Sequence, residues 1–392
     1  MEWPLRDGRE EPVYLDHNAT TPLREEAREA VTEAAARFGN PSSVHHFGRE
    51  ARAIVEDARE AVAALIGAEP AEIVFTSGGT EADALAVHQI PPGCQVLASA
   101  VEHPAVRDNL RRREDVDLVW LPVDGTGVVD DGAFADALAA LDPDRPVFVV
   151  VMLANNETGV VQPVAQLVTL ARAAHGRVLG FSDAVQAAGK LPVDVGGLGV
   201  HYLALSAHKI GGPKGVGALW LHPEAPFAPL WRGGGQERRL RTGTENVIGI
   251  AGFGAAARAV GRRMEEEARR LARLRGRLED GLRALRPDVV ILGADAPRVP
   301  NTTLFAVPGT RAEVLVMRFD LAGVAVSTGA ACSSGRTEPS HVVAAMTADP
   351  AIREAAVRVS LGWSTSEDDI DRFLAAAREI LGVGAPTDPV AP

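Results

Sequence analysis

Lysine is almost absent from this chain. Of its forty basic residues only three are lysines: Lys190, Lys209 and Lys214. The others are arginines, whose guanidinium groups neither lose their proton nor form imines in proteins. Any amine chemistry by a side chain must therefore use one of these three residues. Lys209 follows the apolar segment 202–207, where a strand should end and face a cleft, and Lys214 lies in the glycine-rich turn beyond it. Lys190 is expected at the surface or behind a site.

Cysteine and long apolar runs are scarce as well. Cys94 and Cys332 are the only cysteines, too few for a disulfide framework and typical of a reducing compartment. No apolar run reaches the length of a membrane span, and residues 1–11 lack the apolar stretch of a signal peptide. Acidic residues outnumber basic ones by 52 to 40, which disfavours a nucleic-acid or anionic membrane surface. We expect a cytoplasmic protein without nucleic-acid or membrane partners and without a metal site.

Apolar residues, in contrast, make up 46% of the 392 residues. Short, continuous apolar segments alternate with amphipathic ones, which is the pattern of a largely parallel sheet covered by helices on both faces. The expected strands are 73–76, 95–100, 118–123, 147–153, 178–181, 202–207 and 216–221. A long helix over 251–285 should then lead into a smaller region of mixed helices and strands.

The sequence thus predicts an α/β protein with a mostly parallel, seven-stranded sheet and a smaller α+β domain at the C-terminal end. We expect an N-terminal segment, 1–21, that packs with the small domain, and a large domain over 22–262. The small domain should cover 263–381, and the Pro-, Gly- and Ala-rich end, 382–392, should be a flexible tail.

A glycine-rich turn, Ser77-Gly78-Gly79-Thr80, joins an expected strand to an expected helix. Glycine allows close approach of the backbone, and a helix N-terminus offers free N–H groups and a partial positive charge, so this turn suits a phosphate. A plain strand-to-helix turn explains the same residues equally well. The spacing matches neither the P-loop nor the dinucleotide-binding fingerprint.

Other polar residues also stand where expected strands end. Asp183 could pair with a protonated ring nitrogen and Gln186 with a neighbouring ring oxygen, although helix capping is the simpler explanation for Asp183 alone. His103 could stack on a planar ring or transfer protons, but a single histidine more often has only a structural role. Asn156, within Asn155–Gly159, could aim an amide at the same ligand or merely form a turn.

Taken together, these residues indicate pyridoxal 5'-phosphate. A phosphate turn, a ring-stacking histidine, an amide, a carboxylate and Lys209 all fall at the carboxyl ends of successive expected strands. These are the groups that this cofactor requires: a phosphate anchor, ring contacts, a partner for the pyridinium nitrogen and an imine-forming lysine. A nucleotide would account for the turn but not for Lys209 or Asp183.

Cys332 is the candidate nucleophile. It lies in segment 327–336, whose small residues and glycines predict an exposed, mobile loop, whereas a structural cysteine normally has bulky apolar neighbours. Cys94, directly before an expected strand, is interpreted as structural.

Nine short motifs occur in order along the chain: YLDHNATT at 14–21, GNPSS at 39–43, FTSGGTEAD at 75–83, EHP at 102–104, NNETG at 155–159, SAHK at 206–209, RTGTEN at 241–246, GAAC at 329–332 and RVS at 358–360. On these motifs the chain resembles the cysteine desulfurases, the NifS- and IscS-like branch of the class V aminotransferases, which are fold-type I pyridoxal phosphate enzymes. The resemblance runs from residue 14 to about residue 371.

The resemblance implies a role for each matching residue. Lys209 would bind the cofactor covalently, His103 would stack on its ring and assist proton transfer, and Asp183 would pair with the ring nitrogen. Cys332 would accept the sulfur. The implied phosphate contacts are Gly79, Thr80, Ser206, His208 and, from a second subunit, Thr244. The implied contacts of the ring oxygen are Asn156 and Gln186, and those of the substrate carboxylate are Arg358 and Asn40.

The same resemblance implies a homodimer that removes sulfur from L-cysteine. The products would be L-alanine and a persulfide on Cys332, which is passed to an acceptor protein for iron–sulfur assembly, tRNA thiolation, DNA phosphorothioation or a thio-metabolite. A selenocysteine lyase, a cystine or cysteine C–S lyase, and a non-catalytic scaffold protein of the same fold remain alternatives. The chain departs from the family at His17, where Asn is more usual.

Overall fold

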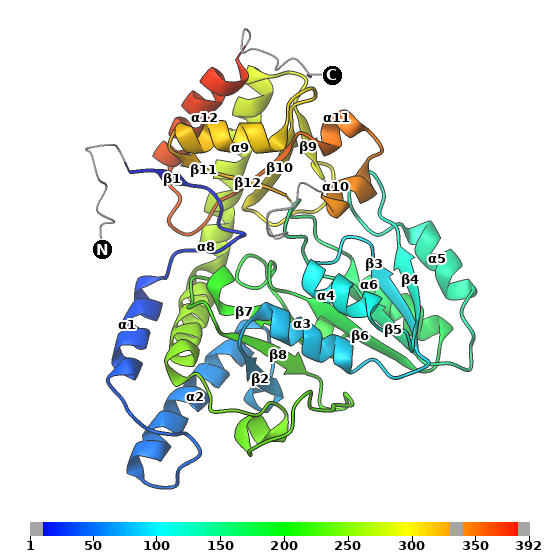
Figure 1. Ribbon diagram of the computed structural model, residues 1–392, viewed down its shortest axis with the longest axis vertical. Helices are drawn as coiled ribbons and strands as arrows, with labels where there is room; N and C mark the ends of the chain where they lie inside the picture. The colour runs from blue at the N-terminus through cyan, green and yellow to red at the C-terminus, as the bar shows by residue number, and fades with distance from the viewer. Residues whose placement is uncertain (1–10, 330–339, 383–392) are drawn as a thin grey trace.

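The computed structural model describes residues 11–329 and 340–382. Cys332 and almost all of the expected tail therefore lie outside the described residues. Figure 1 shows two regions, a larger one built on a wide sheet and a smaller one above it, with one long helix running through both.

The larger region contains the mostly parallel, seven-stranded sheet that the sequence predicts. Its strand order is β2-β8-β7-β6-β5-β3-β4, and only β8 runs antiparallel to its neighbours. The strands are β2 (Ile73–Thr76), β3 (Gln95–Ser99), β4 (Asp117–Leu121), β5 (Val147–Val150), β6 (Val178–Asp183), β7 (Tyr202–Ser206) and β8 (Gly217–Leu221). All but the edge strand β4 are buried along their whole length, apart from one half-buried position in β6, which explains their continuous apolar sequences.

Helices cover the sheet and frame its edges (Figure 1). They are α1 (Glu25–Ala35), α2 (His46–Leu65), α3 (Gly79–His88), α4 (Pro104–Arg111), α5 (Asp131–Ala139), α6 (Val164–Ala174) and α7 (Val195–Leu198), with the short turns η1 (Pro70–Glu72), η2 (Ala207–Lys209) and η3 (Gln236–Arg239). Local sequence fixes several starts: the side chain of His103 caps α4, and Pro104 occupies its first position, where a missing N–H is harmless.

The long helix of the sequence prediction is confirmed. α8 (Val247–Leu285) begins where the Asn246 side chain caps the N–H of Gly249, and it packs against α1, α2 and α12. Because α1 and α2 belong to the larger region and α12 to the smaller one, α8 joins the two (Figure 1).

The smaller region is built on a four-stranded antiparallel sheet of order β12-β13-β10-β9. Its core is a separate apolar cluster that includes Phe305, Phe319 and Phe373. The N-terminal strand β1 pairs with β11 of this region, so the first described residues lie against it. Its elements are β1 (Val13–Tyr14), β9 (Val290–Leu292), β10 (Thr302–Ala306), α9 (Ala312–Leu321), β11 (Val324–Ala325), β12 (Ser327–Thr328), α10 (His341–Met346), α11 (Pro350–Arg353), β13 (Ala356–Ser360) and α12 (Glu367–Leu381).

Among the helices of the described residues, none is long and apolar enough to span a bilayer.

Candidate active site

The polar residues that follow the parallel strands lie together at the end of the large sheet where the carboxyl ends of these strands meet. Asp183 is the last residue of β6, Ser206 is the last residue of β7, and Lys209 follows in η2. Asp183 pairs with Ala204 across the β6–β7 ladder, so the two strands present Asp183 and Lys209 at neighbouring positions. In open α/β sheets this edge is where ligands bind.

The turn between β2 and α3 forms a cradle beside Ser206. A Cβ atom on Gly79 would lie 2.9 Å from Val185 Cγ2 and 3.5 Å from Ser206 Cβ, so no side chain fits there without movement. The Ser206 hydroxyl is buried and has no hydrogen-bond partner among the described residues. Thr80, the next residue of α3, is exposed. A free hydroxyl and unpaired N–H groups at a helix start are suited to a phosphate.

Lys209 is held by the backbone of the N-terminal segment. Its Nζ donates hydrogen bonds to the carbonyl oxygens of Asn18, at 2.6 Å, and Ala19, at 2.9 Å. Gln186 Nε2 donates to the same Asn18 carbonyl at 3.0 Å. One carbonyl group therefore brings Lys209 and Gln186 together, although they come from different elements.

Arg358, on β13 of the smaller region, reaches the same place. It is 2% exposed, and its Nη1 donates to the Asn156 carbonyl at 3.0 Å while its Nη2 contacts Asp16 Oδ1 at 2.7 Å. Its Nε is buried and has no partner among the described residues. The Asn156 carbonyl also accepts from Asn18 Nδ2 at 3.1 Å. Arg358 therefore lies at the junction of the two regions with unused hydrogen-bonding capacity.

Two histidines border the site in their neutral forms. Burial, with the positive charge of Lys209 as a smaller cause, lowers the pKa of both His103 and His208 to about 4. His103 Nδ1 accepts from the Ala105 N–H at 3.1 Å, so the proton of the neutral ring is on Nε2. His208 Nδ1 lies 3.1 Å from Thr20 Oγ1.

Asp183 belongs to a group of three buried carboxyls. Burial raises its pKa to about 6, and a hydrogen bond from Val185 N–H and the charge of Lys209 oppose the rise. Burial raises the pKa of Asp83 and Glu102 well above the usual range, and the nearby Asp183 raises both further. Asp183 therefore ionises most readily of the three, and its buried charge favours a cationic partner.

Three predicted site residues are not brought to this cluster. Asn40 lies in the connection between α1 and α2, where its Oδ1 accepts from the Ser42 N–H. Figure 1 shows this connection at the opposite end of the molecule from β10 and β12. Thr244 lines a small cavity of about 120 Å³ together with Thr76 and Ser77, at the start of the glycine-rich turn. Cys332 lies outside the described residues.

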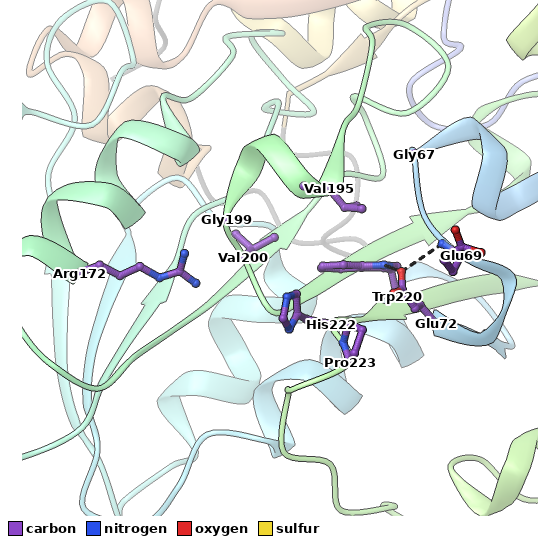
Figure 2. A pocket seen from close by; sticks show the side chains of 11 residues that line it. Gly67, Glu69, Glu72, Arg172, Val195, Gly199, Val200, Trp220, His222 and Pro223 are labelled. Atoms are coloured by element: carbon purple, nitrogen blue, oxygen red, sulfur yellow. Dashed lines mark hydrogen bonds between the residues drawn. The ribbon is translucent and has the colours of Figure 1, made fainter.

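A larger cavity lies elsewhere in the fold. Figure 2 shows this space of about 360 Å³, lined among others by Arg172, Trp220 and His222, and it contains none of the predicted site residues. Leu221, the end of β8, pairs with Tyr202, the start of β7, so this cavity lies at the sheet edge away from Lys209.

Sequence reasoning gave no role to Asn18 and left Lys190 either at the surface or behind a site, and the structure places both residues at the centre of the cluster. Asn18 contacts Lys209, Gln186 and Asn156, yet the sequence signalled it only as part of the 14–21 motif. Lys190 is not a surface residue as one interpretation had it: its Nζ bonds Asn18 Oδ1 and Gln186 Oε1. The rarity of lysine was the signal that could have identified it.

The family model "Aminotransferase class-V" matches residues 13–373. The chain belongs to the class-V aminotransferase family. Within this family, a protein named cysteine desulfurase from Cereibacter sphaeroides is 48% identical over 374 residues, covering 93% of this chain and 94% of the relative. The crystal structure of a NifS-like protein from Rickettsia africae superposes with a TM-score of 0.86 at 32% identity, covering 94% of this chain and 99% of the other. A structure titled "SspA in complex with cysteine" has a TM-score of 0.75 at 28% identity and covers 89% and 98%.

Proposed function

We propose that this class-V aminotransferase family member is a pyridoxal phosphate-dependent cysteine desulfurase. The observation that carries the proposal is the convergence of Lys209, Asp183 and the Gly79–Ser206 cradle at one sheet edge, with Arg358 bonded to the same network. The relatives named cysteine desulfurase match nearly the whole chain and support the choice of reaction.

The residues present suit the cofactor. The buried Ser206 hydroxyl without a partner and the start of α3 at Gly79 would hold its phosphate, with Thr80 and His208 as further contacts and Thr244 contributed by a second subunit. Asp183, whose burial calls for a cationic partner, would pair with the ring nitrogen. Gln186 and Asn156 would contact the ring oxygen, and Lys209 would bind the cofactor covalently. When bound, this cofactor withdraws electrons from the substrate carbon through its ring.

The chain's own residues would then handle protons and orientation. Arg358 would bind the carboxylate of L-cysteine, since its guanidinium is buried, fixed by two contacts and has a free Nε–H. Lys209, as a free amine once substrate is bound, would move the α-proton. His103, neutral with its proton on Nε2, would donate or accept a proton over the ring face.

Cys332 would take the sulfur as a thiolate. The C–S bond of L-cysteine breaks, its electron pair stays on carbon and is protonated to give L-alanine, and an S–S bond forms on Cys332. The thiol proton of each cysteine is conserved between the alanine methyl group and the persulfide, so no outside oxidant or reductant is needed. The persulfide would then pass to a sulfur-acceptor protein.

A homodimer would explain why Asn40 and Thr244 lie away from the cluster within a single chain. Phe38, Val44 and Phe47, in the same segment of the chain as Asn40, expose apolar side chains: Val44 is 89% exposed, and the rings of Phe38 and Phe47 are stacked. Apolar surface of this kind marks contacts between subunits. In such a dimer, we place Asn40 and Thr244 near the partner's cofactor.

The domain division predicted from the sequence is kept as part of the proposal. Each chain would consist of an N-terminal segment 1–21, a large domain 22–262, a small domain 263–381 and a tail 382–392.

Reconstitution with pyridoxal phosphate tests the proposal. The wild-type protein should gain a visible absorption band and release alanine from L-cysteine. Lys209→Ala should lose the band of the covalent adduct and the activity, while Lys214→Met, which alters an exposed lysine five residues away, should retain both. A colourless wild-type protein after reconstitution would contradict the proposal and would favour a non-catalytic scaffold protein.

The alternative reactions on the same scaffold are selenocysteine lyase and cystine or cysteine C–S lyase activity. Neither requires a protein thiol to accept the sulfur. Alanine release from cysteine and selenocysteine, compared in wild type and Cys332→Ala, separates them, because only the desulfurase loses its cysteine reaction when the thiol is removed.

A further inference from the structure

Lys190 lies inside the candidate active site, in the segment that follows β6. Its Nζ is 3.0 Å from Asn18 Oδ1 and 2.5 Å from Gln186 Oε1. Both partners are neutral amide oxygens, and within the described residues Lys190 forms no ion pair with a carboxylate. Lysines usually keep their ammonium group in water, so an Nζ bonded to two side-chain amides inside the protein indicates a specific role.

The contacts determine which way the Gln186 amide faces. The Lys190 amine presents N–H donors to Gln186, so Oε1 must turn toward it. On the other side, the Asn18 carbonyl can only accept, so Nε2 must turn toward that oxygen, and the two lie 3.0 Å apart. With one Nε2 hydrogen committed to Asn18, the second remains for another acceptor.

The same amine also anchors Asn18. The Asn18 Oδ1 accepts from Lys190 and from Asn301 Nδ2 at 3.1 Å, while its Nδ2 donates to Thr302 Oγ1 at 2.9 Å. These bonds fix the residue whose main-chain carbonyl accepts from Lys209 Nζ. Lys190 and Lys209 are therefore joined through a single residue.

Within the described residues, the groups that change the pKa of Lys190 by their charge are both cationic. Lys209 of η2 and Arg358 of β13 are the positive ones, and His17, buried in the N-terminal segment, feels the charge of Lys190 in turn. Burial, with Lys209 and Arg358 as smaller causes, holds the pKa of Lys190 well below its usual range.

We propose that Lys190 is a positioning residue for the cofactor ring. It holds the Gln186 amide with its free N–H toward the ring oxygen, and it holds Asn18 so that its carbonyl receives Lys209. The inference rests on the function proposed above and extends it to a residue whose contacts lie behind those that would touch the cofactor.

Titration of the visible absorption band of the reconstituted protein tests this inference. A hydrogen bond donated to the ring oxygen opposes protonation of the Lys209 linkage, so its loss favours the protonated form. Lys190→Met, which keeps an unbranched apolar side chain but removes the amine and its donors, should raise the midpoint of the titration by about one pH unit or more. Lys214→Met is the matched control and should leave the midpoint unchanged.

A double-mutant cycle shows whether Lys190 acts through Gln186. In a Gln186→Leu background, most of the shift caused by Lys190→Met should disappear. Lys190→Arg keeps donors at this place and serves as the second variant if the methionine variant does not fold. An unchanged midpoint, or an equal shift in both backgrounds, would overturn the inference. Absence of any band in the wild-type protein would instead refute the proposed function.

Discussion

At the scale of single residues, the fold buries an ionisable carboxyl group, that of Asp183, within the candidate site. Asp183 is 5% exposed, and its pKa is raised from 3.8 to about 6. Because the folded, cofactor-free protein binds this proton more tightly than the unfolded chain, Asp183 contributes stability below the unfolded pKa. That contribution is lost as the pH rises through about 6.

Asp183→Asn should therefore have opposite effects in the two forms of the protein. At pH 7 the cofactor-free variant should unfold at a higher temperature than wild type, because the amide removes a buried charge that Lys209 and the Val185 N–H only partly compensate. With pyridoxal phosphate bound, the variant should be the less stable, because it lacks the anion that pairs with the ring nitrogen. Thermal unfolding of both forms between pH 4 and 7 measures this, and the same order in both forms would contradict the assigned role.

Arg358 gives a second prediction at this scale. Lysine in its place keeps the positive charge but loses the planar pair of donors that fits a carboxylate. Arg358→Lys should lower kcat/KM for L-cysteine roughly 30-fold, corresponding to about 2 kcal/mol, mainly through KM. Steady-state kinetics measure the effect, and an unchanged KM would show that the carboxylate binds elsewhere.

At the scale of elements, the turn after β5 carries Asn156 and ends at Gly159. Gly159 has φ +76°, and a Cβ atom there would lie 2.8 Å from Thr302 Cβ and 2.9 Å from Val299 Cγ2. Gly309 has a similar φ of +82° but no atom near its missing Cβ. Substituting Gly309 therefore measures backbone strain alone, whereas substituting Gly159 measures strain together with steric crowding.

Gly309→Ala should cost about 1–2 kcal/mol of stability, the penalty for a left-handed alanine. Gly159→Ala should cost about 2–4 kcal/mol, because overpacking adds to the same penalty. It should also weaken substrate binding, since the turn supplies the Asn156 carbonyl that holds Arg358. Chemical denaturation compares the two, and equal losses would show that the turn tolerates a side chain.

Regular elements were predictable from the sequence, but the contacts between them were not. The continuous apolar segments identified the strands of the large sheet, and the polar residues that follow them, such as Asp183 and Lys209, could be expected at its carboxyl edge. The contacts of Lys190 with Asn18 could not, because 172 positions in sequence separate them. The left-handed turn at Glu237–Arg239 was equally hidden, because it contains no glycine and is secured by the buried Arg59–Glu237 ion pair.

At the scale of the whole molecule, the smaller region completes the site. Arg358 comes from β13, while Asn156, to which it bonds, belongs to the larger region. The N-terminal segment crosses between them: β1 pairs with β11, and Asn18 contacts Lys209. The relative placement of the two regions therefore sets the distance between Lys209, the proposed cofactor anchor, and Arg358, the proposed carboxylate-binding residue.

The proposed dimer gives a prediction at the same scale. Val44→Asp should convert the dimer into a monomer without unfolding it, because Val44 is 89% exposed within the chain. Leu321→Asp, at the end of α9, is a control at a comparably exposed position, 82%, and should leave the dimer intact. Sedimentation of the three proteins distinguishes them, and a dimeric Val44→Asp variant would exclude the Phe38–Phe47 surface as the interface.

The central claim is that sulfur leaves L-cysteine and is bound by Cys332. Its most direct test is mass spectrometry of the reconstituted protein after a single turnover with L-cysteine, followed by thiol alkylation and digestion. The peptide that contains Cys332 should carry one additional sulfur atom, in equal amount to the alanine formed, and the Cys94 peptide should carry none. Alanine formation with no additional sulfur on Cys332, or full turnover by Cys332→Ala, would contradict it.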